Sequence, residues 1–221
     1  MLPFDINHPQ QKDSIQCYTN GFMVYVRNLK CASTFFGSSF EKCWRWESIK
    51  WSNINWETQH VFSHMLDPLE RRFKGLVEYI NMHGLSASFH TDARFQTFVK
   101  NAVVLDEHTS SYHDTFGNLV YHIDWIPISD YTHEQVIEFT ERLMKHYGIC
   151  TLKNWDYDNV HRTHPEKQAV ERQLRQLCED QKTWPQTVTW YLERDVALYR
   201  HINSRFDPDA ETWVKTSWLR I

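Results

Sequence analysis

The feature that most constrains the fold is a strand-like run followed at once by a strong helix start. Residues 60–66, HVFSHML, are rich in apolar side chains and form a short buried strand pattern. Asp67 then fits an N-cap, Pro68 the first helical position, and Glu70 the closing position of a capping box. Apolar residues continue at helical spacing up to Gly84. This segment therefore predicts a strand, a tight turn and a helix.

The same order occurs elsewhere along the chain. GFMVYVRN reads as a buried strand and is followed by a possible helix, while later segments alternate in the same way. The further strands are expected at 102–106 (AVVLD) and 119–128 (LVYHIDWIPI), and the helices at 33–42, 132–146, 166–180 and 186–202. Strands alternating with helices predict an α/β domain with a mostly parallel central sheet flanked by helices, and a helical C-terminal part.

Length and composition favour one globular domain. The 221 residues are 41% apolar and 15% aromatic, enough for a packed core. A formal net charge of −4 argues against a nucleic-acid binder. No signal-peptide pattern and no apolar run of about 18 residues is present, so we expect no membrane contact. Five widely spaced cysteines without a CxxC pair favour reduced thiols in the cytoplasm.

Three other segments have plain structural interpretations. The tryptophan-rich stretch 43–56 is typical of aromatic packing under a long connection rather than of a stacking platform for bases or sugars. The basic run RRFK, residues 71–74, reads by itself as an exposed helix face. The segment 191–199, with Asp195 in its middle, indicates helix packing with a buried polar contact.

The stretch NLKCASTFF, residues 28–36, places a lysine and small residues where the first strand turns into a helix. The first turn of a helix has unpaired N–H groups that attract anions, and small residues let an anion approach them. Lys30 would contact an oxyanion, with Ser33 and Thr34 as hydroxyl donors. Ordinary capping is the alternative. The pattern GxxxxGK[ST] is absent, which argues against a nucleoside triphosphatase or kinase.

RNLKCASTFF resembles the 5′-phosphosulfate loop of the sulfotransferase superfamily, particularly of carbohydrate sulfotransferases, which read roughly R-V-P-K-T-A-S-T-S-F. HVFSHMLDPLERRFKGLVEYI is similar to the second signature of that family, an Arg-Asp-Pro-x-x-Arg turn that binds the 3′-phosphate of 3′-phosphoadenosine 5′-phosphosulfate (PAPS). DEHTSSY and YLERDVALY resemble later segments of short sulfotransferase-like chains, some of them from marine viruses. The resemblance covers most of residues 21–202.

The resemblance implies a single P-loop-like sulfotransferase domain over residues 1–221. Its parts would be an N-terminal extension (1–20), the nucleotide-binding units (21–84), an acceptor-side region (85–160), and C-terminal helices with a tail (165–221). It also implies the cytoplasm as location, the host cytoplasm if the chain is viral.

The resemblance assigns roles to both motifs. Lys30 would contact the bridging oxygen and the sulfuryl group, and the backbone cradle would be Cys31, Ala32, Ser33, Thr34 and Phe35. Asp67, Pro68 and Arg71 match the second motif. Two departures stand there: Leu66 replaces the family's arginine, and Lys74 its serine. Either Arg71, Arg72 or Lys74 substitutes in holding the 3′-phosphate, or the PAPS site is degenerate.

Sulfuryl transfer also needs a base for the acceptor hydroxyl. We expect His108 in this role, beside Asp106 and Glu107, with His64 as a second candidate. His60 and His64 are four residues apart in a strand, about 13 Å, which is too far for a metal pair. We expect no metal.

The sequence thus predicts a PAPS-dependent sulfotransferase acting on a hydroxyl of a carbohydrate or small molecule. The alternative is a catalytically degenerate protein of the same fold with a binding or structural role, such as a viral protein.

Overall fold

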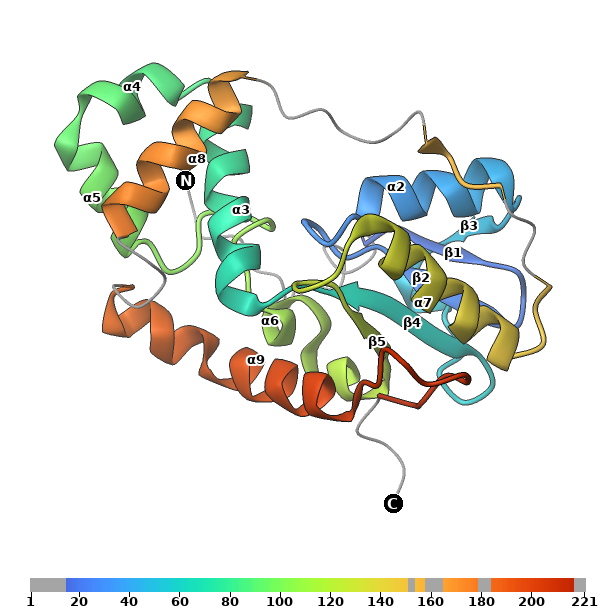
Figure 1. Ribbon diagram of the computed structural model, residues 1–221. Coiled ribbons are helices and arrows are strands. Elements are labelled where there is room, and N and C mark those ends of the chain that lie inside the picture. Colours follow the sequence, from blue (N-terminus) through green and yellow to red (C-terminus); the bar gives the residue numbers. More distant parts are fainter. Residues whose placement is uncertain (1–14, 151–153, 158–164, 179–183, 217–221) are drawn as a thin grey trace.

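The computed structural model describes residues 15–150, 154–157, 165–178 and 184–216, and these contain one five-stranded sheet (Figure 1). The strand order is β3-β1-β2-β4-β5. The strands are β1 (Cys17–Thr19), β2 (Met23–Val26), β3 (Glu47–Ile49), β4 (His60–Met65) and β5 (Asp124–Pro127). The pairs β2–β4 and β4–β5 are parallel, whereas β1 pairs antiparallel with both β2 and β3.

The sheet is therefore mixed, and the expectation of a mostly parallel sheet was wrong. The reason is the short connection between β1 and β2, since a turn of a few residues can join only antiparallel strands. Gly21 has φ +90° in this turn, and Asn20 Oδ1 accepts hydrogen bonds from the N–H groups of Phe22 and Met23. β1 lies inside the predicted N-terminal extension, of which residues 1–14 lie outside the described part.

Helices surround the sheet. They are α2 (Ser33–Ser38), α3 (Pro68–Met82), α4 (Ser86–Thr91), α5 (Ala93–Asn101), α6 (Tyr112–Phe116), α7 (His133–His146), α8 (Pro165–Cys178) and α9 (Gln186–Arg205), with a π-helical turn η1 (Ser39–Cys43) and the 3₁₀ turns η2 (Trp51–Asn53) and η3 (Gly117–His122). The predicted helices over 33–42, 132–146 and 186–202 are confirmed, as is the helix predicted to begin at Pro68 and end before Gly84. The helix over 166–180 is confirmed as far as Cys178, and residues 179–180 lie outside the described part.

Alternation along the strands divides the core between the two faces of the sheet. Tyr25 and Phe62 face α2 and α7, where they pack with the phenylalanines of α2 and the apolar stripe of α7. Val24 and Trp125 face the other way, against α6 and α9. A third cluster joins α3, α4, α5, α8 and the first half of α9 in a helical layer beside the sheet (Figure 1).

Two predicted strands differ from the structure. Residues 102–106 are irregular, and within 119–128 only Asp124–Pro127 is a strand, preceded by the 3₁₀ turn η3. The carbonyl groups of Ala102 and Val103 accept hydrogen bonds from the Arg72 guanidinium instead of from a neighbouring strand. The backbone of this apolar segment is thus satisfied by a side chain.

The tryptophan-rich connection packs into the core, as predicted. Trp46 and Trp51 are 6% and 5% exposed. Trp46 stacks on Phe40 with ring centroids 4.6 Å apart, and Trp51 contacts Trp56 at 5.0 Å. These contacts attach the connection to both faces of the sheet. The five cysteines, all within the described residues, are thiols and form no disulfide with one another.

Candidate functional site

A cavity of about 500 Å³ lies beyond the carboxyl end of β2. Five segments contribute to its walls: the loop after β2 with the start of α2, then α3, the loop before α6, the start of α7, and α8. The lining residues are Arg27, Leu29, Lys30, Ala32, Ser33, Thr34, Phe35, Glu78, His108, His133 and Lys167. In an open α/β sheet this edge is the usual place for a ligand.

The loop 27–32 is held by buried polar contacts. Asn28 is 1% exposed, and its Nδ2 donates to the carbonyl of His64 at 2.9 Å. The backbone carbonyl of Asn28 accepts from the Cys31 N–H at 3.2 Å. Lys30 and Ala32 have φ values of +69° and +54°. A left-handed conformation costs about 1 kcal/mol or more for residues other than glycine, so the surrounding contacts hold this turn in a strained form.

The start of α2 presents donors to the cavity. Ala32 is the N-cap and its side chain offers no acceptor, so the first N–H with a helical partner is that of Phe36, which bonds the Ala32 carbonyl. The three preceding N–H groups have no partner within the helix, as at any helix start. Arg27 reaches the same wall, where its Nη2 donates to Thr34 Oγ1 at 3.3 Å. Its buried Nε has no partner among the described residues.

Lys30 and Lys167 share one carboxylate. Lys30 Nζ lies 2.8 Å from Glu78 Oε2, and Lys167 Nζ is paired with the same oxygen. Burial by itself raises the pKa of Glu78, but the hydrogen bonds from the two lysines overcome it and lower that pKa to about 2. Burial lowers the pKa of Lys30, against the opposing effect of Glu78. With Arg27, the cavity holds three cationic side chains and one carboxylate.

His108 stands in the cavity wall with a carboxylate behind it. Its side chain is 11% exposed, and Nδ1 lies 3.1 Å from Asp106 Oδ2. Asp106 Oδ1 accepts from the His108 N–H at 2.9 Å, which fixes the backbone too. Because Nδ1 is engaged by Asp106, Nε2 is the ring nitrogen left for proton transfer. The pairing of a histidine with an orienting carboxylate is typical of a general base.

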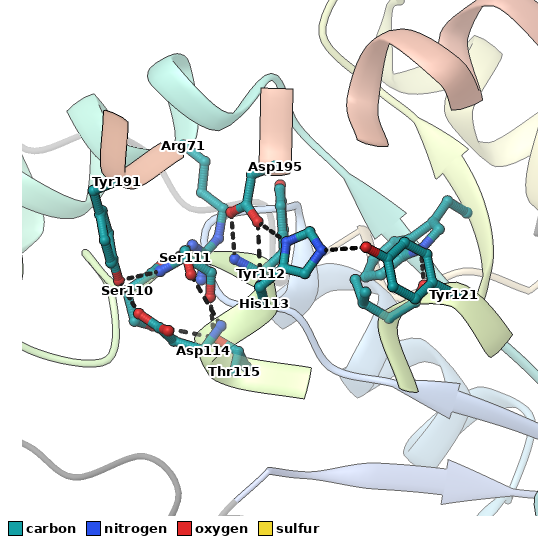
Figure 2. Close-up of polar contacts among 12 residues, drawn as sticks. Arg71, Ser110, Ser111, Tyr112, His113, Asp114, Thr115, Tyr121, Tyr191 and Asp195 are labelled. Carbon is teal, nitrogen blue, oxygen red and sulfur yellow. Dashed lines mark hydrogen bonds and ion pairs between the residues drawn. The ribbon is translucent and has the colours of Figure 1, made fainter. Parts of the chain in front are cut away.

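The loop after His108 is anchored to α9 by a buried polar network (Figure 2). Asp195 is 1% exposed and accepts from the N–H of Tyr112 at 2.5 Å and from His113 Nδ1 at 2.5 Å. The Tyr191 hydroxyl accepts from the Ser111 N–H at 2.8 Å and donates to Asp114. The predicted buried polar contact of the segment 191–199 is confirmed. Its effect is to fix the loop that carries His108.

His64 lies away from the cavity. It is fully buried, stacks on Phe36 with ring centroids 3.8 Å apart, and its Nε2 bonds Thr140 Oγ1 at 2.9 Å. Thr140 gives its own proton to the Val136 carbonyl, so His64 Nε2 is the donor of this pair. Burial is the main reason why the pKa of His64 falls to about 3. This environment describes a neutral core histidine and leaves His108 as the candidate base.

The residues of the second motif do not line the cavity. Asp67 caps α3, its Oδ1 accepting from the N–H groups of Leu69 and Glu70 at 2.9 and 3.1 Å. Burial is the main cause that raises the pKa of Asp67. The capping box is not the one expected, because the Asp67 N–H donates to Ser129 Oγ at 2.6 Å.

Two arginines of this motif bind backbone carbonyls. Arg71 is 3% exposed and donates to Leu29 and Ser110; Arg72 is 1% exposed and donates to three carbonyls, of residues 102, 103 and 109. The interpretation of RRFK as an exposed helix face was therefore wrong for both arginines. It holds for Lys74, whose side chain is 45% exposed and lies 3.8 Å from Glu70.

The structure thus brings together part of the predicted set and adds to it. Lys30, Ala32, Ser33, Thr34, Phe35 and His108 line one cavity. Cys31 is fully buried below the loop, where burial raises the pKa of its thiol. No sequence pattern pointed to the other lining residues Arg27, Glu78, His133 and Lys167, because their meeting depends on how α3, α7 and α8 pack.

No family model matches the chain, and no match was found among curated proteins or solved structures. Among the described residues, no three His, Cys, Asp or Glu side chains gather closely enough to hold a metal ion. No helix in this part of the chain is long and apolar enough to cross a membrane.

Proposed function

We propose that this chain is a PAPS-dependent sulfotransferase that transfers a sulfuryl group to a hydroxyl of a carbohydrate or other small acceptor. The observation that carries the proposal is one cavity lined by Lys30, by two further cations, by the uncapped start of α2 and by His108, which pairs with Asp106. Cations and N–H donors suit an oxyanion, and a histidine on the same cavity suits a hydroxyl nucleophile.

The residues divide the chemistry between them. PAPS would supply the activated sulfuryl group, and Lys30, Arg27 and the N–H groups of α2 would hold its oxyanions. His108 Nε2 would take the proton of the acceptor hydroxyl as its oxygen bonds to sulfur. Lys30 would stabilise the negative charge left on the phosphate when the old S–O bond breaks. Positioning and electrostatics would supply most of the acceleration, by analogy with phosphoryl transfer.

A second candidate is a degenerate protein of this fold that binds an anion without transferring it. The observation that favours it is the engagement of Arg71 and Arg72 with backbone carbonyls. With Leu66 also in place of the family's arginine and 3% exposed, Lys74 is the cation of the second motif left for a 3′-phosphate.

Titration with adenosine 3′,5′-bisphosphate tests the proposal. A ligand at 100 times its Kd stabilises the folded state by about 2.7 kcal/mol, which is a readily measured rise in Tm. We expect such a rise, its loss in Lys30→Ala, and its retention in Lys145→Ala, which removes an exposed lysine of α7. No rise at millimolar ligand would overturn the PAPS proposal. Binding without transfer from PAPS to a panel of sugar and phenol acceptors would favour the degenerate protein.

A further inference from the structure

The carboxylate of Glu78 pairs with two of the three cationic side chains that line the cavity. Its Oε2 atom bridges Lys30 Nζ, 2.8 Å away, and Lys167 Nζ. The three side chains come from the loop after β2, from α3 and from α8, and each lines the same cavity. One oxygen shared by two ammonium groups is the arrangement in which a ligand oxyanion would be held.

We propose that Glu78 is a resident counter-ion that stands in for a ligand oxygen. When a tetrahedral oxyanion enters, one of its oxygens takes the position of Oε2 between Lys30 and Lys167, and the Glu78 side chain turns aside. This inference rests on the proposed anion site and deepens it. Lys167 becomes a binding residue and Glu78 the residue that sets how much negative charge the cavity accepts.

The burial of the three groups supports this role. The side chains of Lys30, Glu78 and Lys167 are 18%, 19% and 29% exposed, so they lie within the cavity rather than on an open surface. Two half-buried lysines without an anion would repel each other and lose part of their hydration. A carboxylate between them removes that cost in the free protein, and a more highly charged ligand competes for the same position.

The charges in the cavity predict how the affinity for an anion changes when the Glu78 charge is removed. Among the side chains that line the cavity, Arg27, Lys30 and Lys167 face one carboxylate, so positive charges exceed negative ones by two. Loss of the Glu78 charge leaves three, and the attraction for an anion increases. A purely structural salt bridge predicts the reverse, because its loss would misplace both lysines.

The experiment uses inorganic pyrophosphate, a bridged pair of tetrahedral oxyanions, measured by calorimetric titration at fixed ionic strength on the full chain. We expect Glu78→Gln to bind it about tenfold more tightly than the natural chain, the equivalent of about 1.4 kcal/mol. Glu70→Gln is the matched control: it lies on the same helix and pairs with Lys74 and Arg175, outside the cavity. Its affinity should not change.

Unchanged or weaker binding by Glu78→Gln overturns the proposal, as does a natural chain that fails to bind pyrophosphate. Lys167→Ala provides an independent arm in case Glu78→Gln does not fold: it should bind pyrophosphate about tenfold more weakly, and full affinity overturns the bridging position. The proposed function can fail while this proposal stands. A chain that binds pyrophosphate but not adenosine 3′,5′-bisphosphate would support the role of Glu78 as counter-ion and contradict the PAPS proposal.

Discussion

The carbonyl oxygen of His108 lies 2.1 Å from the position that a Cβ atom would take on Gly75. A backbone oxygen cannot rotate out of the way as the end of a side chain can. The loop that carries His108 therefore rests directly on α3, at a distance that only a glycine permits. Since His108 lines the cavity, this contact fixes how close that wall of the cavity lies to α3.

Gly75→Ala should destabilise the protein by about 2 kcal/mol. Alanine is favoured over glycine in a helix by about 1 kcal/mol, and overpacking costs about 1–3 kcal/mol. The contact with a fixed backbone oxygen puts the overpacking cost at the upper end of that range, which leaves a net loss of about 2 kcal/mol and displaces the loop. Urea unfolding measures the loss. Lys74→Ala, at the exposed neighbouring position, should stay within about 0.5 kcal/mol of the natural chain. A Gly75→Ala variant of full stability would show that the loop does not lie against α3.

Arg72→Met should cost about 3 kcal/mol. The variant removes the donor for the carbonyls of residues 102, 103 and 109, and buried acceptors without partners cost about 1–3 kcal/mol each. Burial lowers the pKa of Arg72 to about 10, so the group is still charged at neutral pH. Hydrogen exchange should rise over 102–109 in particular. Arg94→Met, at an exposed site of α5, is the control, and equal losses in both variants would contradict the role of Arg72.

These contacts explain where sequence patterns succeeded and where they failed. The strand, turn and helix around Asp67 were predictable because periodicity and capping are local. β1 and β3 have three residues each, too few for a period to be recognised. Residues 102–106 have the apolar character of a strand, but the carbonyls of Ala102 and Val103 accept hydrogen bonds from Arg72, about 30 residues earlier along the chain. No local pattern encodes that partner.

His108→Ala should lower sulfuryl transfer about 10²–10⁴-fold, the usual contribution of a general base, while the affinity for adenosine 3′,5′-bisphosphate stays the same. Asp106→Asn should lower transfer less, because it keeps the ring in place and removes only the charge at Nδ1. His122→Ala, at an exposed histidine, controls for loss of a histidine as such. Full activity of His108→Ala would exclude it as the base.

His64 should make the protein less stable in acid. Its pKa falls from 6.5 to about 3 on folding, so the unfolded chain binds more protons between these values. The stabilisation by neutral His64 is complete above pH 6.5 and is lost as the pH falls toward 3. His64→Gln keeps a donor for Thr140 and should flatten the pH dependence of the unfolding free energy between pH 7 and 5, by up to about 1.4 kcal/mol per pH unit. Equal slopes, with His122→Gln as control, would contradict the assignment.

The candidate site was predictable in the same uneven way. Lys30 to Phe35 follow from a lysine and small residues at a helix start, and His108 from a histidine beside acidic residues. Arg71 and Arg72 were misplaced because a charge pattern does not show which face of α3 is covered by loops. Glu78 and Lys167 are 89 residues apart, and their pairing is decided by the packing of α3 against α8.

Arg71 joins the two walls of the cavity, since it donates to Leu29 in one loop and to Ser110 in the other. Both loops are thus attached to α3 through the same side chain. We expect the two loops to move together in any motion of the protein, so that the distance between Lys30 and His108 stays constant. A ligand that contacts both residues must therefore fit this distance, because it cannot draw the two residues toward each other.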